Sequence, residues 1–372
     1  MGSMLKKTVI LTVFLLTATG CLFAQSSDWA LGPFERPKDV NPIITPNDTS
    51  TFYCPMRDTV VHWEAMSTFN PAAVVKDKKM YVLYRAEDKL GEMKIGGHTS
   101  RIGMAISDDG LSFKRLNTPV LYHRDDQQKK YEWPGGCEDP RLVETNDGRY
   151  VITYTEWNHK TPRLAIATSK NLTDWNKHGP AFEQAYDGKY NNMDTKSGAI
   201  LTKREGDHLV AIQIDGKYWM YWGVPNIHLA TSRDLIHWKP VENEKGKLKN
   251  VLSPRKGYFD SWLVEAGPPA LLTDKGILVI YNAGNSGSEG DPAIPDSVYT
   301  GGQALFDARH PDKLLDRLGK PFIKPEKSYE KSGQYTSGTT FLEGLAHFNN
   351  QWFIYYGMAD SRVGVVTSGT EE

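Results

Sequence analysis

The sequence predicts an all-β protein, and more specifically a five-bladed β-propeller. Three observations lead to this prediction. A nine-residue motif recurs at a nearly constant spacing, five pairs of apolar segments flank polar turns, and no long amphipathic helix interrupts them. Short, evenly spaced strands with a repeated turn motif are typical of propellers, in which antiparallel sheets repeat around an axis.

The repeated motif combines a strand end, a polar turn and an aromatic residue. It occupies residues 105–113 (AISDDGLSF), 167–175 (ATSKNLTDW) and 230–238 (ATSRDLIHW), so its copies begin 62 and 63 positions apart. Asp, Asn and Gly favour turns, because they accept local backbone hydrogen bonds or tolerate positive φ. We expect Ala-x-Ser to end one strand and the aromatic residue to begin the next.

Each predicted blade begins with a pair of apolar segments. Turn sequences such as Asn146-Asp147-Gly148 between them favour β-hairpins. One domain over residues 45–370 accommodates all five pairs, although a pair of β-sandwiches is the alternative fold for strands of this spacing. The paired segments are 72–75 with 80–84, 141–144 with 150–154, 199–202 with 219–222, 269–272 with 277–281, and 340–348 with 352–356.

The N-terminus has the pattern of an export signal. Residues 1–3 are typical of a cloning scar, and two lysines precede an apolar run that ends in small residues before Cys21. This pattern predicts a signal peptide within residues 1–24, either of the lipoprotein type with a lipid anchor at Cys21 or cleaved after Ala24. Residues 25–44 then form an N-terminal extension. We expect a periplasmic or outer-membrane protein of a bacterium.

The composition argues against several functional classes. The formal net charge is −1, so no concentrated basic face is available for a nucleic acid. Beyond the N-terminus no apolar stretch reaches 18 residues, so no transmembrane segment is predicted. The histidines lack the paired spacing of a zinc site, and we expect neither a metal nor a cofactor. Cys54 and Cys137 are expected to be free thiols rather than a disulfide.

Polar and acidic residues stand at the starts of the predicted inner strands. These positions face the axis of a propeller, and Glu138, Asp139 and Glu265 are the acidic ones. Glycoside hydrolysis uses one carboxylic acid to protonate the leaving oxygen and one carboxylate to activate water or attack carbon. Acidic residues on separate blades are able to supply such a pair. Capping of turns is the structural alternative for the same residues.

The chain also resembles glycoside hydrolase family 130. The resemblance implies a five-bladed propeller that acts on β-mannosides with inversion, as a phosphorylase or as a hydrolase, with a mannose-containing oligosaccharide as its partner. The similar segments run in order along residues 40–370, and they are 70–72 (NPA), 83–86 (LYRA), 136–141 (GCEDPR), 267–269 (GPP), 299–307 (YTGGQALFD) and 355–360 (YYGMAD).

The same resemblance implies roles for individual residues. Asp139 resembles the family's general acid, which acts through the 3-hydroxyl of the sugar. Arginine and carboxylate side chains suit sugar diols, because they form paired hydrogen bonds in a fixed geometry. Ion pairs between blades are the alternative for Arg85 and Arg141. The implied substrate-binding residues are Asn70, Arg85, Arg101, Glu138, Arg141, Asp360, Tyr299 and Asn282.

A hydrolase is favoured over a phosphorylase. Phosphorylases hold a phosphate dianion with cationic side chains, and at three such positions of the family this chain has 222–224 (WGV), 281–283 (YNA) and 263–265 (LVE). Glu265 would repel phosphate and is the predicted general base. Export favours hydrolysis too, since a sugar phosphate is useful only inside the cell. These features resemble the family's exported β-1,2-mannosidases.

Three other functions are weighed against this one. A β-mannoside phosphorylase would release mannose 1-phosphate. A non-catalytic sugar-binding propeller on the cell surface would not need Asp139 and Glu265 together. A glycosidase of the arabinanase type would carry an acid at the entry of the first blade, where this chain has Asn70.

Overall fold

The computed structural model of the protein describes residues 27–92 and 94–369, and the predicted signal peptide with Cys21 lies outside them. Within this part of the chain the protein is built almost entirely of β-strands, which confirms the predicted all-β class. Among the described residues the helical elements are one short helix, α1 (Lys129–Glu132), and two 3-10 segments (Ala185–Gly188 and Ser328–Glu330). Within residues 27–92 and 94–369, no helix has the length and apolar character needed to cross a membrane.

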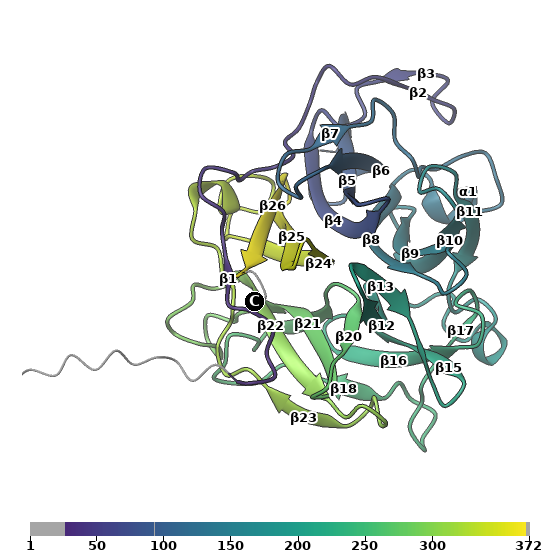
Figure 1. Ribbon diagram of the computed structural model, residues 1–372. Coiled ribbons are helices and arrows are strands. Elements are labelled where there is room, and N and C mark those ends of the chain that lie inside the picture. The colour runs from purple at the N-terminus through teal and green to yellow at the C-terminus, as the bar shows by residue number, and fades with distance from the viewer. Residues whose placement is uncertain (1–26, 93, 370–372) are drawn as a thin grey trace, which may run out of the picture.

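The described strands form five antiparallel groups that follow one another along the chain and surround a common centre (Figure 1). The first group comprises β4 (Ser67–Lys76), β5 (Lys79–Gly91), β6 (His98–Ser107) and β7 (Lys114–Arg115). The second comprises β8 (Gly136–Glu144), β9 (Tyr150–Trp157), β10 (Arg163–Ser169) and β11 (Asn176–Pro180). The third comprises β12 (Gly198–Glu205), β13 (His208–Ala211), β14 (Gln213–Ile214), β15 (Lys217–Trp222), β16 (Ile227–Ser232), β17 (Trp238–Pro240) and β18 (Asn250–Leu252).

The last two groups complete the arrangement. The fourth comprises β19 (Leu263–Ala266), β20 (Ala270–Leu272), β21 (Ile277–Gly284), β22 (Tyr299–Phe306) and β23 (Leu314–Arg317). The fifth comprises β24 (Thr340–Phe348), β25 (Gln351–Met358), β26 (Arg362–Ser368) and the N-terminal β1 (Phe34–Glu35). A separate hairpin is formed by β2 (Phe52–Cys54) and β3 (Thr59–Val61). All five predicted hairpins are therefore confirmed.

Hydrophobic clusters hold neighbouring groups together. Among the described residues, four of the five buried clusters join groups that are adjacent in chain order, and the remaining cluster joins the fifth group to the first. In that cluster Trp63, Tyr84 and Ala86 pack with Ala346, Tyr355 and Val363. The core is thus divided among the spaces between sheets, because each sheet buries both of its faces against its neighbours.

The N-terminal segment closes the last sheet. β1 pairs with β26 in antiparallel register, so the two ends of the described chain meet in one sheet. Trp29 Nε1 donates a hydrogen bond to Asp316 at 2.7 Å, and the main chain of Leu31 exchanges hydrogen bonds with the Gln303 amide. The predicted extension is therefore packed onto the sheets from residue 29 onward.

The repeated motif forms the same turn in three groups. Ser107, Ser169 and Ser232 each accept hydrogen bonds from main-chain N–H groups two and three residues later. Trp175 and Trp238 donate from their indoles to the main chain three residues back. The motif thus ends one strand and begins the next, as predicted. Both predicted free cysteines, Cys54 and Cys137, are unbridged and buried.

Candidate active site

Bulges on three inner strands carry polar side chains at the centre of the molecule. The register shifts between Phe69 and Pro71 on β4, between Glu138 and Arg141 on β8, and between Leu342 and Gly344 on β24. The extra residues include Asn70, Asp139 and Glu343. A bulge inserts an unpaired residue and redirects its side chain. A proline follows the first two, and proline has no N–H to continue the ladder.

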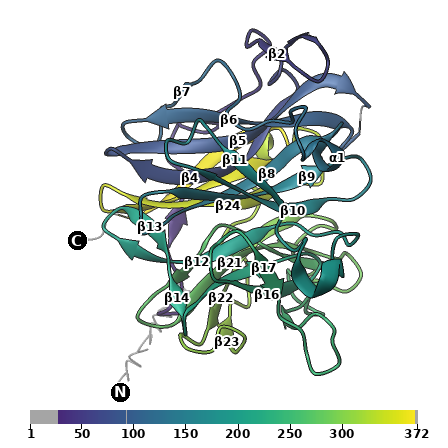
Figure 2. The same ribbon diagram turned by 90° about the vertical axis from the view of Figure 1, so that its right-hand side faces the viewer.

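A pocket with a volume of about 170 Å³ opens above these bulges. Six of the ten predicted site residues line it: Asn70, Arg85, Asp139, Glu265, Tyr299 and Asp360. The other residues that line the pocket are not among the predicted site residues. They are Phe69, Glu87, Ile95, Gly96, Lys196, Gln334, Tyr335, Thr339 and Phe341. Ile95 and Gly96 of the lining belong to the β5–β6 connection, which lies on the side of the molecule opposite the C-terminal end of the described chain (Figure 2).

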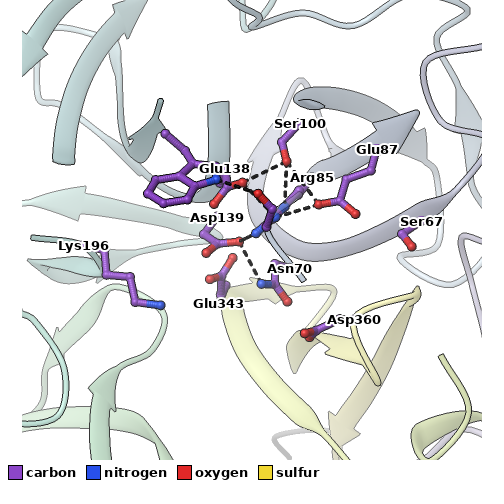
Figure 3. Close-up of polar contacts among 12 residues, drawn as sticks. Ser67, Asn70, Arg85, Glu87, Ser100, Glu138, Asp139, Lys196, Glu343 and Asp360 are labelled. Atoms are coloured by element: carbon purple, nitrogen blue, oxygen red, sulfur yellow. Dashed lines mark hydrogen bonds and ion pairs between the residues drawn. The ribbon is translucent and has the colours of Figure 1, made fainter. Parts of the chain in front are cut away.

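Arg85 is the centre of a buried charge cluster (Figure 3). Its guanidinium contacts Glu87 at 2.6 Å, Glu138 at 2.8 Å and Asp139 at 3.0 Å. Its Nε donates to Ser100 Oγ at 3.1 Å, and Ser100 in turn donates to Glu138 at 3.0 Å. A planar guanidinium with five donors is suited to fixing several carboxylates at once. Glu138 therefore stands behind the pocket and braces Arg85, which lines it.

Asp139 is held as a carboxylate in the empty pocket. Its Oδ1 accepts hydrogen bonds from the Asn70 amide at 2.8 Å and from Arg85 at 3.0 Å. Burial alone would raise the pKa of Asp139, but the charges of Arg85 and Lys196 and the Asn70 hydrogen bond outweigh burial and lower it. Asp139 is therefore ionised near neutral pH.

Two neighbouring carboxyls are able to hold a proton near neutral pH. Burial raises the pKa of Glu138 to about 8, although Arg85 opposes the shift. Burial likewise raises the pKa of Asp360 to about 7. The negative charge of Asp139 contributes to both shifts, since like charges disfavour a second ionisation. The cluster around Arg85 thus retains a proton in the pH range where Asp139 itself is ionised.

Glu265 lies at the opposite side of the pocket, on β19. Its carboxylate accepts a hydrogen bond from Ser197 Oγ and pairs with Lys196 Nζ at 3.2 Å. The charge of Glu265 raises the pKa of Lys196, so this lysine remains protonated. Lys196 and Ser197 immediately precede β12. Two adjacent groups of strands therefore build the side of the pocket opposite Arg85.

Arg141 and Glu343 form a buried strut beneath the pocket. Arg141 donates at 3.0 Å to the main-chain oxygens of Asp139, Ala266 and Gly267, and it pairs with Glu343 at 3.0 Å. These carbonyls belong to the predicted acid Asp139 and to the two residues that follow the predicted base Glu265. The strut therefore sets the separation between the strands that carry Asp139 and Glu265.

Besides Glu138, three predicted substrate-binding residues do not line the pocket. Arg141 is only 2% exposed and belongs to the strut. Arg101 is fully buried and pairs with Asp88 at 2.8 Å. Asn282 bridges two strand groups, because its amide donates to the Leu342 carbonyl and accepts from the Leu342 N–H. The geometry of all three is that of a frame around the site.

Two of the pocket residues that were not predicted lie in or beside segments that the sequence marks as starts of inner strands or as family motifs. Lys196 begins the segment Lys196-Ser197-Gly198, which stands at an inner-strand start, and Glu87 directly follows the segment 83–86. Gln334 and Tyr335 lie in the connection before β24, which matches no repeat or motif. Tyr335 donates to the Ser297 carbonyl, and Gln334 donates to Glu87 at 2.7 Å. Their role emerges only from the folded chain.

The raised pKa of Asp360 predicts a pH-dependent stability. The folded pKa of about 7 exceeds the ordinary value near 4, so the stabilising contribution is complete below pH 4 and is lost as pH rises to about 7. Asn cannot ionise, so we expect Asp360→Asn to gain melting temperature relative to the native protein between pH 5 and pH 8. Thermal melts at both pH values measure this, and a difference that is independent of pH would contradict it.

Comparison with known proteins identifies the family. Residues 38–372 match glycoside hydrolase family 130, which is described as beta-1,4-mannooligosaccharide phosphorylase. The chain belongs to glycoside hydrolase family 130. The chain is 32% identical over 307 residues to the 1,2-beta-oligomannan phosphorylase of Thermoanaerobacter sp. (strain X514). The matched region covers 82% of this chain and 90% of that protein.

Solved structures share about half of the sequence and the fold. A glycosyl hydrolase from Bacteroides ovatus superposes with a TM-score of 0.90 at 54% identity, over 92% of this chain and 94% of that one. A second structure superposes with a TM-score of 0.91 at 53% identity, over 93% of this chain and 98% of that one. It accompanies the finding that the family of mannoside phosphorylases contains glycoside hydrolases that target beta-1,2 mannosidic linkages in Candida mannan.

Proposed function

We propose that this family 130 protein is a five-bladed β-propeller that hydrolyses β-1,2-mannosidic bonds with inversion. The observation that carries the proposal is the charge of the pocket. Among the described lining residues, four acidic side chains face two cations, and both cations are already paired. Arg85 is bound to Glu87, Glu138 and Asp139, and Lys196 is bound to Glu265. A phosphate dianion would enter a pocket of net negative charge with no free counter-ion in its lining.

The geometry suits a single displacement by water. The inner mannose would lie between Asp139 and Glu265, which are carried by β8 and β19 on different sides of the pocket. Glu265 takes a proton from a water molecule that attacks the anomeric carbon. The bond to the leaving oxygen breaks, and that oxygen receives the proton of the sugar's 3-hydroxyl. Asp139 then donates its own proton to the oxygen of the 3-hydroxyl. Inversion needs room for the water between the two carboxyls.

The cluster around Arg85 supplies the proton for this step. Because the pKa of Asp139 is lowered, the proton that it donates would come from Glu138 or Asp360, whose raised pKa values let them hold one near neutral pH. Arg85 would then be shared between Asp139 and the hydroxyls of the substrate. The solved structure with 53% identity that accompanies the report of β-1,2-mannoside hydrolases supports the same activity.

A mannoside phosphorylase is the second candidate, because the Thermoanaerobacter relative carries that activity in its name. The two functions differ in one requirement. A hydrolase releases free mannose from β-1,2-mannobiose at a rate that does not depend on phosphate, and the first product is the α-anomer. A phosphorylase is inactive without phosphate and forms mannose 1-phosphate.

We expect phosphate-independent release of mannose. The measurement is product analysis by chromatography and proton NMR, with the enzyme dialysed free of phosphate and then assayed with and without added inorganic phosphate. Mannose 1-phosphate as the product would overturn the hydrolase. The absence of any product from β-mannosides would favour a sugar-binding protein instead.

A further inference from the structure

The connection before β24 brings one side chain, Gln334, to three other segments of the chain. Its amide nitrogen lies 2.7 Å from Glu87 Oε2, 2.9 Å from Ser67 Oγ and 3.2 Å from the main-chain oxygen of Asp360. A carboxylate and a carbonyl only accept hydrogen bonds, so the nitrogen of the amide must face them. These three partners are drawn on the side of the charge cluster away from Lys196 (Figure 3). The reaction proposed above uses none of these contacts.

The carboxylate of Glu87 depends on this amide. Glu87 is fully buried, and its Oε1 contacts Arg85 at 2.6 Å and accepts a hydrogen bond from Ser100 Oγ at 3.3 Å. Its Oε2 accepts from Gln334. A buried carboxylate oxygen that loses its donor carries a large desolvation cost. Without the amide, Glu87 would therefore take up a proton or turn away, and Arg85 would lose part of what fixes it.

The main chain around Gln334 is held by contacts other than its amide. Gly333 approaches Ala359 so closely that a Cβ there would collide with the main-chain oxygen of Ala359. The Tyr335 N–H donates to the same oxygen at 3.1 Å, and the Tyr335 hydroxyl donates to the Ser297 carbonyl at 2.7 Å. The segment thus keeps its place without the Gln334 side chain. A substitution at Gln334 should therefore leave the fold intact and act on Glu87.

The charge of Glu87 bears on where the cluster keeps its proton. Burial raises the pKa of Glu138 to about 8 and that of Asp360 to about 7, and the negative charge of Glu87 adds to both shifts. A cationic donor to Glu87 would cancel this effect, because its own charge would stabilise the ionised carboxyls nearby. The amide of Gln334 is a neutral donor. It satisfies Glu87 and leaves the negative charge of Glu87 in force.

We propose that Gln334 is a positioning residue that holds Glu87 as the charged partner of Arg85 and thereby fixes Arg85 against Asp139. Gln334 acts through these two side chains, which lie between it and the carboxyl of Asp139. This inference rests on the proposed function, because it concerns the group that supports the proton donor of the reaction.

The test uses a side chain that is a donor at low pH only. Gln334→Glu keeps the length of the side chain, and a protonated carboxyl is able to donate to Glu87, whereas an ionised one is not. Acidic groups predominate around this position, so the pKa of the new carboxyl should lie above its ordinary value. The charged groups on β5, on the β5–β6 connection, on β8 and after β25 are Arg85, Glu87, Lys94, Glu138, Asp139 and Asp360.

The expected result is a loss of activity that grows with pH. The kcat of Gln334→Glu on β-1,2-mannobiose, divided by that of the native enzyme, should be close to one at pH 5. It should fall about tenfold or more by pH 8, the size of effect typical of a lost hydrogen bond to a charged group. Steady-state kinetics in phosphate-free buffers of equal ionic strength measures the ratio. Thermal melting at both pH values establishes that the variant is folded.

A matched control and a second variant complete the test. Gln213→Glu makes the same change at an exposed position on β14, and its ratio to the native enzyme should not vary with pH. Gln334→Met has no donor at any pH, so its kcat should be reduced at pH 5 as well as at pH 8. A ratio for Gln334→Glu that is the same at both pH values, or native kcat in Gln334→Met, would show that the inference is wrong. Release of mannose 1-phosphate by the native enzyme would instead refute the hydrolase, and the comparison of pH values would still test Gln334 with that product.

Discussion

Asp139→Asn is expected to lower kcat on β-1,2-mannobiose by about 10³-fold, within the range found for the loss of a general acid. The asparagine oxygen still accepts from Asn70 and Arg85, so the shape of the site is kept while the transferable proton is removed. Steady-state kinetics measures the loss. Thermal melting at the same pH establishes that the variant is folded.

A substrate with an activated leaving group separates an acid from a structural residue. Aryl β-mannosides with a nitrophenol leaving group need little protonation, so Asp139→Asn should lose far less activity on them than on mannobiose. Asp108→Asn, at an exposed turn aspartate, is the matched control and should retain activity on both substrates. An equal loss on both substrates would remove Asp139 from the role of general acid.

Glu265→Gln is expected to lower kcat by several orders of magnitude, about 10³-fold or more, because the attacking water loses its base. External azide needs no deprotonation, so it should restore turnover and yield the α-mannosyl azide. NMR of the product measures this. A small loss, or the absence of azide rescue, would point to a different base.

The same substitution should change the response to phosphate. Glu265→Gln leaves Lys196 without its carboxylate partner, and the net charge of the pocket becomes less negative by one. Inorganic phosphate is therefore expected to bind the variant and to compete with substrate, whereas it has little effect on the native enzyme. Inhibition constants at fixed ionic strength measure the difference. Equal constants for the two proteins would argue against the electrostatic basis of the proposed function.

The strands were predictable from the sequence because their signals are local. The hairpins follow from apolar runs around polar turns, and the motif ending at Trp175 or Trp238 forms a turn through its own side chains. Asp139 and Glu265 were predictable as pocket residues for a related reason. Both stand at the entry of an inner strand, where the chain direction already places them near the centre.

The remainder of the site depends on contacts between distant parts of the chain. Gln334 reaches Glu87 across 247 positions, and no motif in its connection indicates this. The family resemblance implied a substrate contact for Arg141, with an ion pair between blades as the alternative. Beyond the bulge at Asp139, its guanidinium pairs with Glu343 and donates to carbonyls beneath the pocket. Sequence periodicity assigns a residue to a face of a regular strand, and it fails at bulges because the alternation shifts there.

The backbone conformation of the pocket residues bears on how this enzyme could evolve or be engineered. Asn70, Asp139 and Asp360 all have φ near +50°, in the region that glycine adopts most easily. Such conformations cost of order 1–3 kcal/mol for other residues, so glycine would relieve the strain at each position. Directed evolution for heat resistance alone would therefore enrich glycine where the chemistry is performed. Thermostable descendants therefore need to be selected for stability and for activity on a β-mannoside at the same time, because selection for stability alone would favour inactive proteins.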